Sequence, residues 1–234
     1  TLPPSVVPDP FTGDNYRRVV DSFPFWRFAR NSVIVSVVST ALQLVTAATA
    51  AYAFARIEFR GRSALFGLYL ATMMIPLQVI IVPLFIEMRF LGLVDTFAAL
   101  ILPTIVSSFG VFLLRQAFAA LPRELEEAAF IDGAGHFRVF ARVMLPLIGP
   151  AIATFAVFAF MSTWNSFVWP LVITQASDRH VTLPVGLARL NGRFSTDWNV
   201  VLAGSVMTIV PIVAFYLATQ RWIIRSVAYS GLKG

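Results

Sequence analysis

Residues 33–55 read VIVSVVSTALQLVTAATAAYAFA, a run without one charged side chain, and Arg56 follows it directly. A run of this length and hydropathy is typical of a helix that crosses the hydrocarbon core of a bilayer. Arg56, Arg60 and Arg62 crowd the short turn after it. Positive residues in a short loop favour the cytoplasmic side. The stretch therefore predicts a membrane-spanning helix whose C-terminal end lies inside the cell.

Four further segments have the same character, so we expect an all-α, polytopic membrane helical bundle. They are residues 64–86, residues 97–114, a segment within the uncharged run 143–177, and residues 198–220. Composition agrees, because 58% of the 234 residues are apolar and only 13% are charged. So many apolar side chains do not fit inside one soluble core of this length, and lipid must cover much of the surface.

Chain continuity then gives the topology. Residues 87–95 and 175–197 are predicted outside, while residues 115–142 and the C-terminus are predicted inside. Residues 1–30, which are Pro-rich at first, form an extracytoplasmic N-terminal segment in this interpretation. A sixth span is expected to precede residue 1. The domain organisation is then a transmembrane domain over 31–226 and a cytoplasmic tail over 227–234.

Polar and aromatic residues inside the spans are candidates for a solute pathway. Gln78 lies between Pro76 and Pro83, and a second group comprises Trp164, Asn165, Ser166 and Trp169. For Gln78 alone, helix packing is the favoured interpretation, since buried amides often join membrane helices. Aromatic faces beside an amide suit a sugar, whose C–H faces stack while its hydroxyl groups need partners. An aromatic belt at the outer membrane interface explains the two tryptophans equally well.

Several chemistries are not supported by the sequence. No Asp, Glu, Lys, Arg or His occurs in the middle of a predicted span, although ion-coupled transporters usually need such groups. No phosphate loop of the form GxxxxGK[ST] is present, and no acid pair, metal cluster or activated nucleophile is found. Cysteine is absent, and the two histidines are far apart in the sequence. We therefore predict no catalytic residues, no metal site and no cofactor, and an energy source outside this chain.

Residues 121–146, which read LPRELEEAAFIDGAGHFRVFARVMLP, are the most informative stretch. Pro122 suits the first turn of a helix, and the three glutamates that follow suit the positive N-terminal end of its dipole. Gly133 and Gly135 are expected to end this helix, residues 136–143 to form a second short one, and Pro146 to begin the next membrane entry. The result is a helix-turn-helix at the membrane surface, whose small residues permit close approach and whose acids offer partners to a basic surface.

These residues resemble the EAA loop of ABC importer permeases. The match consists of Glu127, Ala128 and Ala129, then Gly133, then Val143 in place of the usual Ile, and finally Leu145 and Pro146. The resemblance implies a coupling helix that docks in a cleft of a cytoplasmic ATPase. It also implies that Glu127, Ala128, Ala129 and Gly133 form the contact core, with Glu127 facing a basic residue. The alternative is an amphipathic interface helix with chance spacing.

From about Asn15 onward, the chain is similar to carbohydrate-type permeases of the maltose-permease class. The residues that carry this similarity are Asn31-Ser32, AYAFAR at 51–56, Trp164-Asn165, Trp169-Pro170 and the tail at 231–234. One departure is Ser166, where many members carry an acid. The resemblance implies the transmembrane domain of a type I ABC importer in the inner membrane of a bacterium or archaeon.

The resemblance also implies the partners and the mechanism. The partners are a second homologous permease subunit, a dimeric ATPase that binds ATP and Mg²⁺, and an extracytoplasmic solute-binding protein. Residues 175–197 are a candidate contact for the binding protein, or simply a solvated loop. The chain is then a permease that moves a sugar-like solute by alternating access and is not itself an enzyme. A permease for amino acids or phosphorylated compounds, a secondary transporter and a scaffold subunit are the alternatives.

Overall fold

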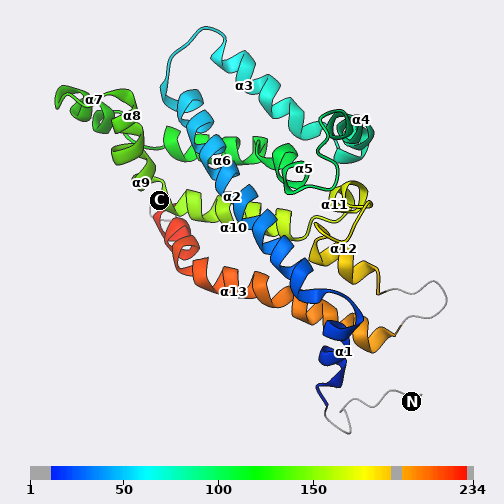
Figure 1. The fold of residues 1–234 in the computed structure, drawn as a ribbon. Helices are drawn as coiled ribbons and strands as arrows, with labels where there is room; N and C mark the ends of the chain where they lie inside the picture. The colour runs from blue at the N-terminus through cyan, green and yellow to red at the C-terminus, as the bar shows by residue number, and fades with distance from the viewer. Residues whose placement is uncertain (1–11, 191–196, 231–234) are drawn as a thin grey trace.

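The computed structural model describes residues 12–190 and 197–230, and within these ranges every regular element is helical. Two helices are long and apolar enough to cross a membrane unbroken, α2 (Phe25–Arg56) and α13 (Trp198–Ser230). Three further crossings qualify when each bent pair of helices counts as one span. The predicted all-α bundle with five apolar crossing segments is confirmed (Figure 1).

The three bent crossings are each interrupted near a proline or a polar residue. The first joins α3 (Arg62–Ala71) and η1 (Thr72–Met74) to α4 (Leu77–Phe90), with a bend of 96°. Pro76 stands at this break, where a missing N–H and a restricted preceding residue end a helix. The second joins α5 (Phe97–Ile101) and η2 (Leu102–Thr104) to α6 (Ser108–Ala119), with a bend of 44°.

The third bent crossing follows the 121–146 loop. It runs through α8 (His136–Val139), the π-helix η3 (Phe140–Met144) and α9 (Leu145–Leu147), and then turns by 79° into α10 (Gly149–Trp164). The uncharged run 143–177 is thus not a single straight span. After α10 the chain breaks again before α11 (Val168–Ile173). Pro146 lies within α9, three residues before α10 begins.

Helix α2 is central, and its polarity is reversed relative to a soluble helix. Its buried face carries small polar residues, among them Ser36, Ser39 and Gln43, while valines such as Val37 and Val45 are exposed. This pattern is expected for a membrane helix, in which apolar side chains face lipid and small or polar ones face neighbouring helices. Helix α2 packs against α6 and α10, and α10 packs in turn against α13.

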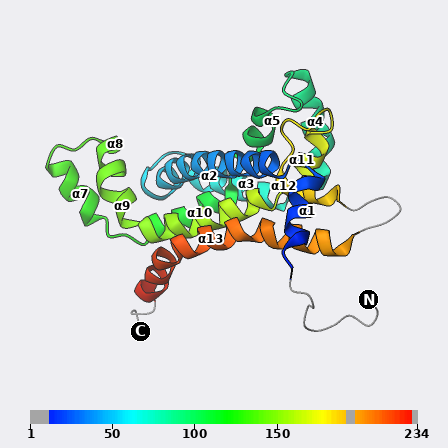
Figure 2. The same cartoon turned by 60° about the horizontal axis from the view of Figure 1, so that its bottom comes forward.

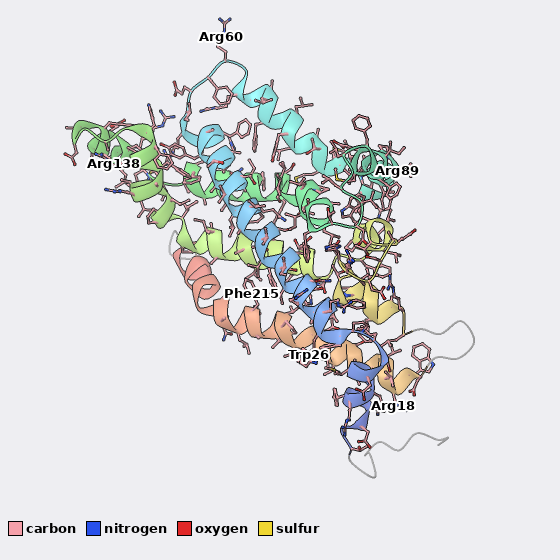
Figure 3. All side chains as sticks on the ribbon, in the orientation of Figure 1. Arg18, Trp26, Arg60, Arg89, Arg138 and Phe215 are labelled. Atoms are coloured by element: carbon pink, nitrogen blue, oxygen red, sulfur yellow. The ribbon has the colours of Figure 1, made fainter. Side chains whose placement is uncertain are left out.

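Segments predicted on opposite sides of the membrane lie at opposite ends of the bundle. One end holds the turn between α2 and α3, helix α7 (Glu124–Ile131) and the C-terminal end of α13; the other holds α1 (Asp14–Ser22) and α12 (Leu183–Ala188) (Figures 1 and 2). Figure 3 shows Arg60 and Arg138 at the first end and Arg18 and Arg89 at the second. This grouping agrees with the predicted topology.

The far end of α2 anchors the loop that precedes α12. The Asn31 amide donates to the carbonyl oxygens of Arg179 and Val181 at 2.8 and 2.9 Å. The Ser32 hydroxyl accepts a hydrogen bond from the backbone N–H of Leu183 at 2.8 Å. The start of α2 therefore positions part of the loop 175–197.

The N-terminal segment differs from the prediction, because α2 begins at Phe25 rather than near residue 33 and α1 precedes it. Phe25 and Phe28 are buried while Arg27 is exposed, so a one-sided apolar face continues the helix beyond the uncharged run. Arg18 of α1 contacts Asp197 before α13 at 2.5 Å, and this hydrogen bond lowers the pKa of Asp197.

At the other terminus, α13 continues to Ser230, past the boundary predicted at residue 227. The tail residues 231–234 and the Pro-rich residues 1–11 lie outside the described residues.

Candidate functional site

The turn after α7 has the geometry that its sequence predicts. Gly133 has φ of +79°, a left-handed conformation that favours glycine. The N–H of Gly133 donates to the Phe130 carbonyl and the N–H of Ala134 to the Ala129 carbonyl, both at 3.0 Å. These two bonds form a Schellman motif, which ends the helix and satisfies its free carbonyl groups. The start of the helix differs from the prediction, because α7 begins at Glu124 after the N-cap Arg123, so Pro122 precedes the first turn and does not lie in it.

A buried ion pair joins α7 to the end of α2. The Nη1 atom of Arg56 lies 3.5 Å from Oε2 of Glu126, and the two side chains are 5% and 11% exposed. Nη2 of Arg56 also donates to the carbonyl oxygens of Phe118 and Leu121, at 2.7 and 2.5 Å. One guanidinium therefore holds together α2, the C-terminal end of α6 and α7.

This pair was not predicted from the sequence, where the loop's acids were expected to face a basic partner surface. For Glu126 that assignment is wrong, since its carboxylate points into the protein towards Arg56. Two sequence features pointed to such a pair. Helix α7 has three acids in its first turn, and the span α2 ends in an arginine. Sequence spacing alone does not say which of three adjacent acids faces inward.

The residues predicted for ATPase contact fall on two faces of the loop. Ala129 and Leu145 pack against a buried cluster that includes Tyr52 and Phe118, so they fix the loop to the bundle. The other predicted residues are exposed, namely Glu127, Ala128, Gly133 and Pro146. The structure therefore separates anchoring residues from residues that are free to meet a partner.

Two large apolar side chains extend this exposed face, and sequence reasoning did not identify them. Ile131 is 86% exposed and Phe137 is 81% exposed. Together with Glu127, Ala128 and Gly133 they form what we call the loop surface. Large apolar side chains presented beside charged ones at the end of a bundle are typical of a protein-binding surface. Their signal in the sequence is the presence of apolar residues among charged neighbours in the loop.

The tryptophans predicted for the pathway are both buried. Trp164 is 1% exposed, stacks on Phe160 and donates its indole N–H to the Thr208 carbonyl at 3.2 Å. Trp169 is 3% exposed and donates to the Ala99 carbonyl at 2.9 Å. Neither ring stands out at the surface as an interfacial aromatic belt would. Their main contribution is to hold α10 against α13 and α11 against α5.

The remaining predicted pathway residues separate around the break after α10. Asn165 lines a shallow groove with Pro184 and Thr208, whereas Ser166 points into a different cleft. Gln78 is exposed on α4 and lines neither of them. Of the predicted group, only Ser166 and Trp169 are brought together.

The cleft that contains Ser166 has a volume of about 360 Å³. It lies between α2, α4, the segment 103–107 and the end of α10. Its lining residues are Gln43, Leu77, Ile80, Leu84, Pro103, Thr104, Val106, Ser107, Ser162, Thr163, Ser166 and Trp169. Gln43 was not predicted, and its signal was an amide within an otherwise apolar and small-residue span. Within the described ranges, no group of three or more His, Asp or Glu is placed to hold a metal ion.

Comparison with protein families gives a match over residues 43–229 to the family of binding-protein-dependent transport system inner membrane components. The chain is 41% identical over 228 residues to the arabinooligosaccharides transport system permease protein AraQ of Halalkalibacterium halodurans. That alignment covers 97% of this chain and 81% of the relative. It is also 34% identical to the trehalose transport system permease protein SugB of Mycobacterium tuberculosis, with 98% and 85% covered.

Solved structures give the same picture. A chain from a bacterial ABC transporter involved in the import of the acidic polysaccharide alginate is similar, with a TM-score of 0.79 and 28% identity. The similarity covers 88% of this chain and 78% of that one. A chain of the MetNI methionine ABC transporter shares the fold, with a TM-score of 0.65 and 16% identity.

Proposed function

Because the chain belongs to the family of binding-protein-dependent transport system inner membrane components, we propose that it is the permease subunit of an ABC importer for a sugar or sugar-like solute. The substrate class is supported by relatives named for arabinooligosaccharides, alpha-glucosides and trehalose. A permease for another small polar solute is the second candidate. The fold shared with a methionine transporter is the observation that keeps it open.

The observation that carries the proposal is the anchored loop with its exposed surface. The loop is tied to α2 and α6 through Arg56 and Glu126, and it presents Ile131 and Phe137 outward. The loop is thus fixed to the bundle on one face and exposes apolar side chains on the other. Such an arrangement suits an element that transmits motion from a partner to the bundle. We infer that the loop surface docks on a separate ATPase subunit, with Glu127 beside a basic residue.

The mechanism that follows is alternating access driven from outside this chain. Closure of an ATPase dimer, which binds ATP and Mg²⁺, moves the loop, and the Arg56 junction passes that movement to α2 and α6 as one unit. A second permease subunit completes the pathway, and an extracytoplasmic binding protein delivers the solute near α1 and the loop 175–197. This chain makes different contacts in the two conformations of the transport cycle, and it neither forms nor breaks covalent bonds.

Replacing Ile131 with glutamate tests the proposal. The side chain is almost fully exposed in this chain, so the change should leave the fold intact, but docking would bury a charge. We expect retention of the ATPase by the assembled importer to weaken about tenfold or more, as for truncation of an interface hot spot. Co-purification of the ATPase and its solute-stimulated ATP hydrolysis are the measurements.

The matched control is Ile131→Met, which keeps an apolar side chain and similar helix propensity. It should retain the ATPase as the parent does. Equal retention by the glutamate variant would contradict docking through the loop surface. Solute uptake that persists without ATP, driven by an ion gradient, would instead support a secondary transporter.

A further inference from the structure

Three interrupted helices meet at the cleft of about 360 Å³ that contains Ser166. Leu77 and Ile80 follow the break at Pro76, Val106 and Ser107 lie in the break before α6, and Ser166 lies in the break after α10. Non-helical backbone at membrane depth is tolerated only where it is buried in protein or lines a water-filled cavity. Breaks that converge on a cleft are the arrangement expected where the cleft holds water or a polar solute.

The polar groups of the cleft are only partly satisfied by the protein. The Thr163 hydroxyl donates to the Ala159 carbonyl at 2.9 Å, and the Thr104 hydroxyl donates to the Ile101 carbonyl at 2.8 Å. By contrast, within the described part of the chain the side chains of Gln43, Ser162 and Ser166 make no hydrogen bond to another residue. Gln43 is 7% exposed and lines the cleft. An amide carries two donors and an accepting oxygen, which is the complement of a pair of sugar hydroxyl groups.

The rest of the wall is apolar. Leu77, Ile80 and Leu84 come from α4, Pro103 and Val106 from the broken segment, and Trp169 from α11. Apolar walls with a few converging polar groups are the usual composition of a small-molecule site, and the volume is within the usual range. This combination suits a pyranose or furanose ring, which has C–H faces as well as hydroxyl edges.

No ionisable side chain occurs among the described residues that line this cleft. A carboxylate or sulfonate that entered would lose water and meet no opposite charge on this subunit, which is costly at membrane depth. Neutral hydroxyl groups would lose water but find Gln43 and the serine hydroxyls. The lining therefore favours a neutral solute over an acidic one.

We propose that this cleft is a solute-contacting subsite on this subunit, and that it selects uncharged glycosyl units through Gln43 and the hydroxyls of Ser162 and Ser166. The inference rests on the proposed importer function and adds the place and the charge class of the ligand. The proposed subsite consists of residues of this subunit alone and is separate from any site that the second permease supplies.

Cysteine protection tests the inference, because these 234 residues contain no cysteine. Ser166→Cys places a thiol in the cleft, while Asn165→Cys, its neighbour, places one in the separate groove beside Pro184. The importer is assembled without its soluble binding protein, so that the permease subunits alone determine which sugar protects the thiol. A small methanethiosulfonate labels the thiol by forming a mixed disulfide and releasing methanesulfinate. The rate of this labelling is measured with arabinotriose, trehalose, diacetylchitobiose or an alginate trisaccharide present.

We expect at least one of the three neutral sugars to slow labelling of Ser166→Cys, by about tenfold when its concentration is about ten times its dissociation constant. The alginate trisaccharide should give no protection, and Asn165→Cys should label at an unchanged rate throughout. Protection of both cysteines, protection by the acidic trisaccharide, or no protection by any neutral sugar would overturn the inference.

A second variant reports on Gln43 itself. Gln43→Leu should raise the KM for uptake of the protecting sugar about tenfold, since a buried hydrogen-bonding site loses its partner. Thr40→Val is the control, because Thr40 is buried one turn away on α2 and does not line the cleft. An unchanged KM for Gln43→Leu would overturn the role of the amide.

Failure of the subsite inference can be distinguished from failure of the proposed function. If the parent complex shows ATP-driven uptake but no protection, only the subsite inference fails. If it shows no ATP-driven uptake, the proposed function fails.

Discussion

Glu126→Ala is expected to destabilise the junction between the coupling loop and α2 by about 3–5 kcal/mol, the usual effect of removing one partner from a buried ion pair. The guanidinium of Arg56 would stay buried among α2, α6 and α7 with only the two carbonyl oxygens as partners. This junction is the proposed route by which closure of the ATPase reaches the membrane spans. Solute-stimulated ATP hydrolysis should therefore decrease in Glu126→Ala together with the stability of the junction.

The measurement is thermal unfolding of the purified importer, together with the ratio of solute uptake to ATP hydrolysis. Glu127→Ala is the matched control, since the neighbouring glutamate is exposed and has the same chemistry. The control should leave the unfolding temperature of this subunit close to that of the parent. Glu126→Gln, which keeps the shape of the side chain, should fall between the two. Equal unfolding temperatures for Glu126→Ala and Glu127→Ala would show that the pair does not hold the loop.

Gly110→Val is expected to disrupt the packing of α6 against α10. A Cβ atom at Gly110 would lie 2.1 Å from Cζ of Phe155, and that ring is only 1% exposed. Because the ring is enclosed, it has little room to move, and overpacking of this kind costs about 1–3 kcal/mol or more. We expect a lower unfolding temperature and a reduced yield of assembled importer.

Gly67→Val provides the control, because Gly67 is also a helical glycine but has open space around its Cβ position. It should be tolerated, and the double variant Gly110→Val with Phe155→Leu should recover part of the loss. A double variant no more stable than Gly110→Val would show that the contact with Phe155 is not the cause.

The sequence predicted the features that depend on local composition. Five apolar segments and the turn at Gly133 are determined within a few residues of each site. The family resemblance of the loop also depended on contiguous spacing. Such features were confirmed because hydropathy and glycine act through the chain's own backbone.

Features that depend on distant partners were missed or wrong. Glu126 faces Arg56 across the bundle, and Trp164 and Trp169 donate to carbonyl groups far away in the sequence. Gln43 enters the cleft only because helices from three other segments converge there. The predicted ATPase contacts and pathway residues remain predictions, and the structure adds which of them are exposed.

The break at Pro76 also has a consequence for the surrounding lipid. The straight piece Arg62–Met74 is only about 20 Å long at 1.5 Å per residue, shorter than the hydrocarbon thickness of about 30 Å. Beyond it, α4 turns away by 96° and exposes Val79, Val82 and Ile86. Hydrophobic mismatch of this size is met by local thinning of the bilayer or by protein contact. Where lipid and not protein covers α3, we therefore expect the acyl chains there to be shorter or more disordered than those beside α2, which is long enough to cross unbroken.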